Sequence, residues 1–199
     1  MKTYPVQYSA DLDLIEGVCL SDFQFPWLER KCPETEFCAV WNAEWFKFQF
    51  QVEDHDIVMF EGANRDESVL GSDRVELFFA TDALLKGPYY GLEMDPRGWV
   101  YDYSARHYRD FDPSWIMPNF ELSAEVIEAG YSVEGKIGLE TLRGLGCLVD
   151  GEMVTGVYRG EFSHSDKGDQ HDWISWVNPG TESPDFHLPE SFGKFLFVE

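Results

Sequence analysis

The fold class of this chain follows from one stretch, Trp45-Phe46-Lys47-Phe48-Gln49-Phe50-Gln51-Val52. Phenylalanines and a valine take the even positions, and lysine and glutamines take the odd ones. An apolar and polar alternation with a period of two is typical of a β-strand that has one buried face and one wet face. The stretch therefore predicts an antiparallel sheet that packs one face on a core.

The same alternation recurs in residues 119–127 and 131–137, and the short loop Glu128-Ala129-Gly130 between them predicts a β-hairpin. One short helix is expected over residues 138–144. Further strands are expected at residues 35–41, 74–80, 89–95, 99–104, 154–162, 173–177 and 194–198. Many short strands without long helices predict an all-β fold, a single antiparallel β-sandwich of jelly-roll type that spans residues 1–199 as one domain.

Composition and charge exclude several classes of partner. The chain has 199 residues, and its 15 Lys and Arg against 37 Asp and Glu give a net charge of 15 − 37 = −22. Nucleic acid is therefore not an expected partner, because phosphates are met by Lys and Arg. No apolar stretch is long enough for a membrane span. No signal peptide is visible, so we expect a cytoplasmic protein if the chain is full length, or one whose leader has been removed.

Four cysteines occur, and none of them forms a CxxC pair. Zinc-ribbon and thioredoxin functions are therefore not indicated. We expect free thiols, with a Cys32–Cys38 or a Cys19–Cys32 bridge as the alternatives.

Common catalytic and metal motifs are absent, among them the P-loop, GxGxxG after a strand, GxSxG and HExxH. Residues 164–172 contain two His and three Asp, but their spacing matches neither an EF-hand nor a zinc site, so a solvated polar loop is the better interpretation. The ligands of any metal stay unassigned. A structural calcium ion at an oxygen-rich loop is compatible with the strongly negative charge.

Two carboxylates could meet on one face of the sheet. Glu76 alternates with Val75 and Leu77, and Glu93 alternates with Leu92 and Met94. If these two strands pair, both glutamates lie on a face that is not the core. Three interpretations follow: a solvated face, hydrogen bonding to a polar ligand, or catalysis, which would need one carboxyl group with a raised pKa.

Aromatic residues make up 16% of the chain, more than a core of this size needs. Flat rings can bury the C–H faces of a pyranose, while polar side chains satisfy its hydroxyls. Phe186 is the most suggestive ring, because it lies in the polar loop Pro184-Asp185-Phe186-His187-Leu188-Pro189, where no core role is evident. The others outside the alternating pattern are Trp27, Trp45, Trp99, Trp115, Trp173 and Trp176.

Taken in order, several segments resemble the family 9 carbohydrate-binding modules, which have a DOMON-like β-sandwich. The resemblance covers roughly residues 35–198, and its motifs are specific only as an ordered set. The segments that carry it are residues 44–58, Ser72-Asp73-Arg74-Val75-Glu76-Leu77-Phe78, residues 89–98, residues 130–137, Ile174-Ser175-Trp176-Val177-Asn178-Pro179 and residues 186–195.

The resemblance implies a non-catalytic module that holds a sugar between two Trp rings, in the service of polysaccharide use. Leu70 takes the place of the first ring and Phe186 that of the second. Glu76 matches a hydrogen-bonding carboxylate, whereas Glu93 replaces a basic residue and Asp95 replaces Asn. These departures point to the divergent, mostly stand-alone branch of the family, with Phe186, Glu76 and Glu93 as the expected ligand-binding residues.

Two further residues are weaker candidates for the same site. Trp99 could supply the missing ring, and Arg159 could either anchor the ligand or serve as a structural partner of Glu76. Two other functions stay open: a glycoside-acting enzyme that uses the paired carboxylates, and a DOMON-like haem or redox binder. The latter would need an exposed Met and His pair, but Met94 falls on the predicted core face.

Overall fold

The computed structural model describes residues 1–165 and 170–199. The alternating stretch forms β4 (Trp45–Glu53), in which Phe46, Phe48 and Phe50 are fully buried. Next to it, β10 (Gly130–Gly138) and β9 (Phe120–Ile127) form the predicted hairpin. The period-two pattern therefore predicted both the strand and the face that it buries.

The remaining strands complete the sheet. They are β1 (Thr3–Tyr8), β2 (Cys19–Leu20), β3 (Thr35–Trp41), β5 (Arg74–Ala80), β6 (Tyr89–Met94), β7 (Val100–Arg106), β8 (Asp110–Asp112), β11 (Leu148–Val149), β12 (Glu152–Ser163), β13 (Gln170–Ser175) and β14 (Gly193–Val198).

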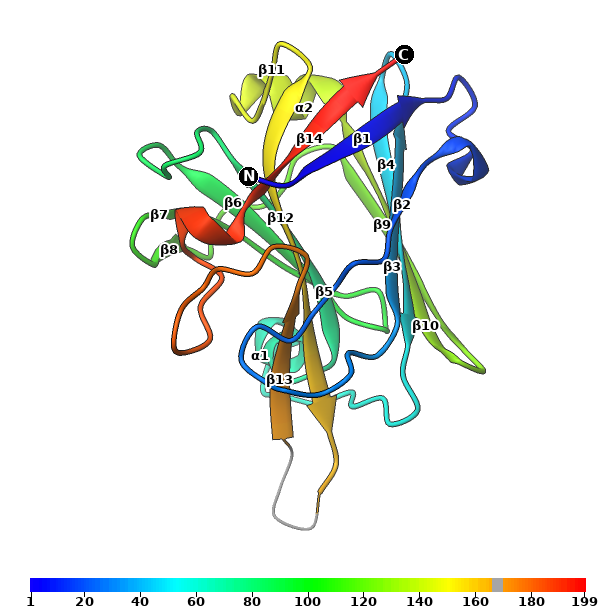
Figure 1. Cartoon of the computed structure of the whole chain (residues 1–199), viewed down its shortest axis with the longest axis vertical. Coiled ribbons are helices and arrows are strands. Elements are labelled where there is room, and N and C mark those ends of the chain that lie inside the picture. Colours follow the sequence, from blue (N-terminus) through cyan, green and yellow to red (C-terminus); the bar gives the residue numbers. More distant parts are fainter. Residues whose placement is uncertain (166–169) are drawn as a thin grey trace.

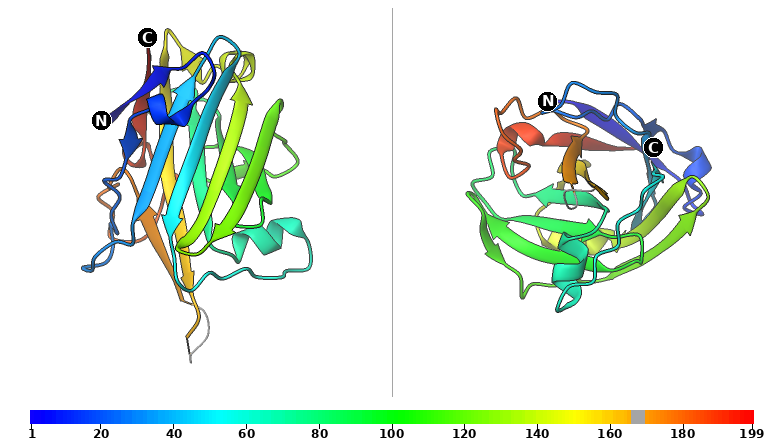
Figure 2. Two further views of the ribbon diagram at one scale, coloured as in Figure 1. Left: turned by 90° about the vertical axis from the view of Figure 1, so that its right-hand side faces the viewer. Right: turned by 90° about the horizontal axis from the view of Figure 1, so that it is seen from below.

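Among the described residues, fourteen strands form one continuous sheet in the order β8-β7-β6-β5-β12-β14-β1-β3-β4-β10-β9, with β2, β11 and β13 as side branches. The sheet curls so that its two halves lie face to face, as Figure 1 and both views of Figure 2 show. This arrangement confirms the predicted β-sandwich. Strand β1 pairs in parallel with β14 and with β3 and so joins the two halves, whereas the other pairings are antiparallel.

Two hydrophobic cores hold the sandwich. The larger one fills the space between the halves, with Phe48, Phe50, Leu77 and Leu92 at its centre. The second lies on the outer face of β5, β6, β7 and β12, where Phe78, Tyr89, Tyr103, Tyr158, Phe186 and Phe192 pack together. The outer face of this half-sheet is therefore covered over much of its length.

Two short helices and two 3₁₀ turns occur in the described part of the chain. Helix α2 (Leu139–Gly144) was predicted, whereas α1 (Arg65–Leu70) was not. The N-cap of α1 is Asn64, whose side chain accepts a hydrogen bond from the Glu67 N–H. The 3₁₀ turns are η1 (Leu14–Glu16) and η2 (Pro189–Ser191). Helix α1 packs against β6 and β7, which brings Leu70 close to the start of β5.

Residues 164–172, interpreted from the sequence as a solvated polar loop, are strand from residue 170 onward. Residues 160–163 end β12, and residues 170–172 begin β13, which pairs with it. His164 Nδ1 donates a hydrogen bond to Asp56 Oδ1, 2.7 Å away. Asp166 and Asp169, two of the metal candidates considered above, lie outside the described residues.

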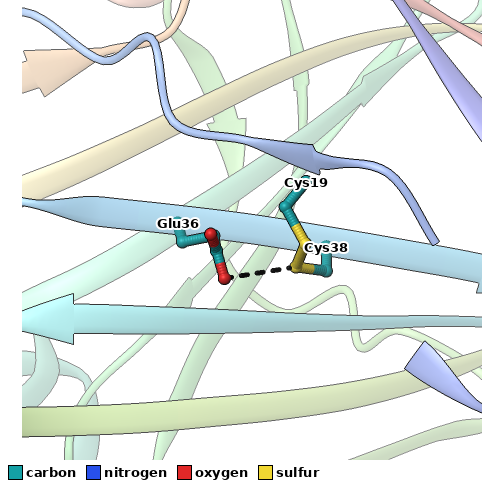
Figure 3. A group of neighbouring side chains, drawn as sticks. All are labelled: Cys19, Glu36 and Cys38. Carbon is teal, nitrogen blue, oxygen red and sulfur yellow. Dashed lines mark hydrogen bonds between the residues drawn. A yellow bond between two sulfur atoms is a disulfide. The ribbon is translucent and has the colours of Figure 1, made fainter. Parts of the chain in front are cut away.

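A disulfide joins Cys19 to Cys38, and Figure 3 shows it beside Glu36. The two cysteines are direct partners across β2 and β3, and their Cα atoms are 4.3 Å apart. Neither bridge considered from the sequence is present, and the expectation of free thiols holds only for Cys32 and Cys147. None of the helices in the described ranges is long and apolar enough to cross a membrane.

Candidate functional site

A pocket of about 270 Å³ opens on the outer face of β5, β6 and β7, beside the second core. Its lining combines charged, hydroxyl and aromatic side chains from these strands, from α1, from β13 and from the loop before η2. The lining residues are Leu70, Arg74, Glu76, Glu93, Tyr101, Tyr103, Arg109, Phe111, Trp173, Pro184, Asp185, Phe186 and His187.

The floor of the pocket is a pair of buried carboxylates. Glu76 on β5 lies directly opposite Glu93 on β6, as the strand pairing required. Arg74 Nε donates to Glu76 Oε1 at 3.0 Å and to Glu93 Oε2 at 2.7 Å. All three side chains are less than a tenth exposed. The structure thus brings the two predicted glutamates together and adds a cation that the sequence analysis had not assigned to them.

Burial decides the ionisation of this floor. Desolvation, together with the facing Glu93 carboxylate, raises the pKa of Glu76 to about 8, although the Arg74 guanidinium opposes this rise. Burial also raises the pKa of the Tyr103 hydroxyl well above its usual range, and both carboxylates add to this effect. Near neutral pH, the floor can therefore hold a proton and still offer carboxylate oxygens and a phenol to a ligand.

Backbone acceptors fix the position of the floor arginine. Its Nη1 donates to the Leu70 carbonyl at 3.0 Å, at the end of α1. The guanidinium also lies 5.2 Å from the centre of the Trp173 ring, within cation–π range. Helix α1 and strand β13, neither of which contains Glu76 or Glu93, therefore hold the cation between the two carboxylates.

Tyr103 completes the floor through a close approach to Gly91. The two residues are cross-strand partners, and a Cβ atom at position 91 would lie 2.3 Å from Tyr103 Cζ. The phenol can lie across β6 only because glycine has no side chain there. The Tyr103 hydroxyl is fully buried, and no hydrogen bond of acceptable geometry reaches it from the described residues, although Glu93 lies near enough to raise its pKa. A buried hydroxyl without a well-placed partner at a pocket indicates a place where a ligand could supply one.

The rim of the pocket is formed by two loops that contact each other. Tyr108 donates to Asp185 Oδ2 at 2.5 Å, and Arg109 Nη1 lies 3.3 Å from Asp185 Oδ1. Nearby, the Tyr89 hydroxyl and His187 Nδ1 are hydrogen-bonded at 3.0 Å. Burial, followed by the charge of Arg109, lowers the pKa of His187 to about 3, so this imidazole is neutral.

Phe186 lines the pocket but is not a free platform. It is only 6% exposed, and its ring stacks on Tyr158 with centroids 4.1 Å apart and an interplanar angle of 10°. Trp27 and Trp173 pack around it. The expectation that Phe186 has no core role was therefore wrong. Its loop folds back onto the outer face of β12, and the ring joins the second core.

The two weaker candidates lie elsewhere. Trp99 borders a separate shallow hollow beside α1, and the Arg97 guanidinium covers its ring at 4.4 Å. Arg159 lies on the opposite face of β12, where it donates to Thr35 Oγ1 and to the Glu53 carbonyl, each at 3.1 Å. The idea that Arg159 pairs with Glu76 was wrong, because successive strand residues point to opposite faces and Arg74 is the residue on the side of Glu76.

A second buried acidic cluster surrounds Arg159 rather than the pocket. Carboxylate oxygens of Asp54, Asp73 and Glu161 lie within 4.8 Å of one another. Arg159 pairs with Glu161 and lies 3.6 Å from Asp54 Oδ2. Burial raises the pKa values of both Asp73 and Glu161 to about 7. These oxygens could hold a cation, but a guanidinium already lies among them.

Sequence reasoning had identified Glu76, Glu93 and Phe186 but missed most of the pocket's other residues. Tyr101 and Tyr103 carried a usable signal, because they lie on a predicted strand, residues 99–104, that follows the strand of Glu93, and the pairing of the two strands places them on the outer face with Glu93. Arg109, Phe111 and Asp185 carried none, because Arg109 and Asp185 come from loops and Phe111 from the three-residue strand β8, and their mutual contact depends on the folded chain. Met94, considered as a haem ligand, is fully buried in the main core, as its position in the alternation had indicated.

The fold and the pocket define a β-sandwich domain with a polar, aromatic-lined cavity on the outer face of one half-sheet. A family model described as "Carbohydrate family 9 binding domain-like" matches residues 21–199. Because this match covers most of the chain, the protein belongs to that family. No curated protein matches the chain.

Solved structures share the fold over nearly the whole chain. A "putative carbohydrate-binding protein" from Bacteroides uniformis is 14% identical, covers 99% of both chains and has a TM-score of 0.76. A family 9 carbohydrate-binding module from Caldicellulosiruptor kristjanssonii in complex with glucose is 14% identical, covers 99% of this chain and 96% of that one, and has a TM-score of 0.64. A family 9 carbohydrate-binding module from the same organism in complex with cellotriose is 15% identical, covers 98% of this chain and 93% of that one, and has a TM-score of 0.65.

Proposed function

We propose that this protein is a single, non-catalytic carbohydrate-binding module, residues 1–199, that holds a sugar or the end of a glycan in the pocket above Glu76 and Glu93. Membership of the family supports sugar binding in general. Two solved structures of the fold are complexes with glucose and with cellotriose, which supports a saccharide of that class. The protein would act in polysaccharide use by bringing such a ligand to partners that process it.

The observation that carries the proposal is the convergence of carboxylates, a guanidinium and a buried phenol, which has no well-placed hydrogen-bond partner among the described residues, under partly exposed rings. Carboxylates accept hydrogen bonds from sugar hydroxyls, and such charge-assisted bonds are stronger than neutral ones. Tyr101, Phe111 and Trp173 are the partly exposed aromatic lining residues, so they offer apolar surface to the C–H groups of a pyranose. Phe186 supports this wall from behind rather than by stacking on the ligand.

Calorimetric titration of the protein with mono- and oligosaccharides, including glucose and cellotriose, tests the proposal. Measured at about pH 9, above the pKa of Glu76, Glu76→Gln should weaken binding by roughly tenfold, because a charged acceptor becomes a neutral one. Glu125→Gln, on the exposed edge strand β9, is the matched control and should bind as the wild type does. The proposal fails if no saccharide binds, or if both variants bind as tightly as the wild type.

The raised pKa of Glu76 supports a second function, a glycoside-acting enzyme in which this carboxyl group serves as the acid. Its contact with Arg74 and its place beneath the pocket suit binding equally well. Release of reducing sugar by the pure protein, lost in Glu76→Gln but not in Glu125→Gln, would favour the enzyme over the binding module.

A further inference from the structure

The charges of the pocket do not balance. Its lining contains three carboxylates, Glu76, Glu93 and Asp185, and two guanidinium groups, Arg74 and Arg109, so the sum is 2 − 3 = −1 with His187 neutral. At the rim, Arg109 and Asp185 pair with each other. With all three carboxyl groups ionised, the surplus negative charge therefore lies at the floor, where one arginine faces two glutamates. In the free protein, a proton on Glu76, whose pKa is raised to about 8, offsets this charge near neutral pH, and a cationic ligand could take the place of that proton.

The hydrogen bonds at the floor are equally incomplete. One Arg74 N–H, on Nε, is divided between the two carboxylates. Its Nη1 group is directed to backbone carbonyls, at 3.0 Å from Leu70 O and 3.5 Å from Ser72 O. Neither glutamate receives the two-pronged pairing that makes arginine–carboxylate contacts strong. In the described part of the chain, Arg74 is the only cation in contact with either carboxylate.

Tyr103 gives an independent sign that a polar group belongs at this point. Its hydroxyl is fully buried, has no well-placed hydrogen-bond partner among the described residues and borders the pocket next to the glutamate pair. A buried polar atom without a partner is costly. A ligand that both donates hydrogen bonds and carries positive charge would satisfy the phenol and the carboxylates together.

We propose that the sugar bound by this pocket is an amino sugar whose ammonium group lies between Glu76 and Glu93. The inference rests on the proposed saccharide-binding function and specifies its ligand class. An ammonium group has three hydrogen-bond donors and a full positive charge. It can therefore pair with the carboxylate oxygens of Glu76 and Glu93 that Arg74 does not contact. A neutral sugar offers the donors without the charge, and an acidic sugar would be repelled by the surplus carboxylate.

The test compares three ligands on the full chain by calorimetry at about pH 7, where a primary amine of a sugar retains much of its proton. They are glucosamine, glucose and N-acetylglucosamine, the last of which keeps the nitrogen but loses its charge. We expect glucosamine to bind roughly tenfold tighter than the other two, the gain of one charge-assisted contact. Added salt should reduce this advantage.

Two variants locate the effect. Glu93→Gln keeps the shape of the side chain and removes the surplus charge. The ratio of the glucosamine affinity to the glucose affinity should therefore fall toward one. Glu128→Gln, in the exposed turn between β9 and β10, removes the same charge far from the pocket and should keep the preference. If Glu93→Gln does not fold, the affinities of the wild-type protein for the three sugars, measured with and without added salt, test the amino-sugar proposal.

The outcomes separate the two proposals. Binding of glucose or N-acetylglucosamine at least as tight as that of glucosamine would overturn the amino-sugar inference and leave saccharide binding in place. A preference for glucosamine that survives in a folded Glu93→Gln variant would also overturn it. If none of the three sugars, and no other glycan, binds the wild type, both proposals fail together.

Discussion

At the scale of single residues, Gly91 shows how one missing side chain shapes the pocket. The Tyr103 ring occupies the space that a Cβ atom at position 91 would need, and its hydroxyl would lie 2.5 Å from that atom. Both residues belong to regular strands, so the requirement for glycine comes from a close approach and not from backbone conformation. The floor therefore depends on a position that makes no contact of its own with a ligand.

Replacing this glycine with alanine should move the phenol and reduce stability. We expect Gly91→Ala to lower the free energy of unfolding by about 1–3 kcal/mol, the usual cost of overpacking a filled interior. Gly144→Ala is the matched control, because it lies at the end of α2 and a Cβ atom added there would meet no atom within 4 Å. It should be neutral or stabilising by up to about 1 kcal/mol. Urea unfolding checks both, and equal effects would contradict the close-approach argument.

Two aromatic residues at the pocket should respond differently to truncation. Phe186 packs on Tyr158 within the second core, so Phe186→Ala should cost about 3–5 kcal/mol of stability. Trp173 is only partly buried and lines the pocket, so Trp173→Ala should weaken sugar binding by roughly tenfold. Thermal unfolding and calorimetric titration separate the two effects. Trp45→Ala, a partly buried tryptophan on β4 away from the pocket, should leave affinity unchanged.

At the scale of secondary-structure elements, the short strand β2 is attached to the sandwich by the Cys19–Cys38 disulfide. β2 contains two residues, too few for its hydrogen bonds alone to hold it against β3. The bridge closes a loop with a sequence separation of 19. It thus fixes the segment that precedes β3 onto the half-sheet opposite the pocket.

Reducing this disulfide should destabilise the whole protein. Loop-closure entropy for a loop of this length predicts a loss of about 3 kcal/mol. Urea midpoints measured with and without a thiol reductant test the value. The Cys19→Ser variant should unfold at the lower urea midpoint of the reduced wild type, and adding reductant should not change that midpoint. A wild-type midpoint that does not change on reduction would contradict the contribution assigned to the bridge.

The elements also show where sequence reasoning succeeds and where it fails. β4 and β10 each bury one face and β9 partly buries one, so their alternation predicted them well. Strand β1 was missed because it contains Pro5, which a strand tolerates poorly within a sheet. The start of β13 was interpreted as part of a polar loop because His171 and Asp172 are polar, yet the Asp172 carboxylate pairs with Arg30. Such a long-range ion pair has no local signature.

The same physical limit applies to the candidate site. Glu76 and Glu93 followed from strand alternation and pairing, which are regular. Arg159 was assigned to the wrong face because both faces of β12 are buried. The sequence of β12 therefore has no polar and apolar alternation that would indicate toward which face each side chain points. Phe186 was correctly placed at the pocket but not in the core, because the packing of a loop depends on what it folds against.

At the scale of the whole molecule, buried carboxyl groups couple stability to pH. The pKa values of Asp73 and Glu161 are raised to about 7 and that of Glu76 to about 8, chiefly by burial. A carboxyl group whose pKa is raised in the folded state contributes stability that is present at low pH and is lost as pH rises through that value. The net charge of −22 acts in the same direction, since deprotonation adds to the repulsion.

Stability should therefore fall as the pH rises from about 4.5, near the pKa values of unfolded carboxyl groups, through about 8, the highest of the folded values. Within that window, up to about pH 6.5, His187 opposes the trend, because its lowered pKa makes the folded state gain stability as the pH rises. The thermal midpoint measured across this range checks the prediction. Glu161→Gln should flatten the dependence, whereas Glu125→Gln, which removes the same charge from an exposed strand, should keep it. A midpoint that is constant or rises with pH would contradict the assignment.

The central claim is that the pocket above the Glu76 and Glu93 pair holds a saccharide. The most direct measurement is a crystal structure of the protein grown with glucosamine or glucose at saturating concentration. We predict a sugar ring over β5 and β6, with its polar groups within hydrogen-bond distance of the two carboxylates and its edge against Trp173 or Phe111. A sugar bound instead beside Trp99, or on any surface away from Glu76 and Glu93, would contradict the account.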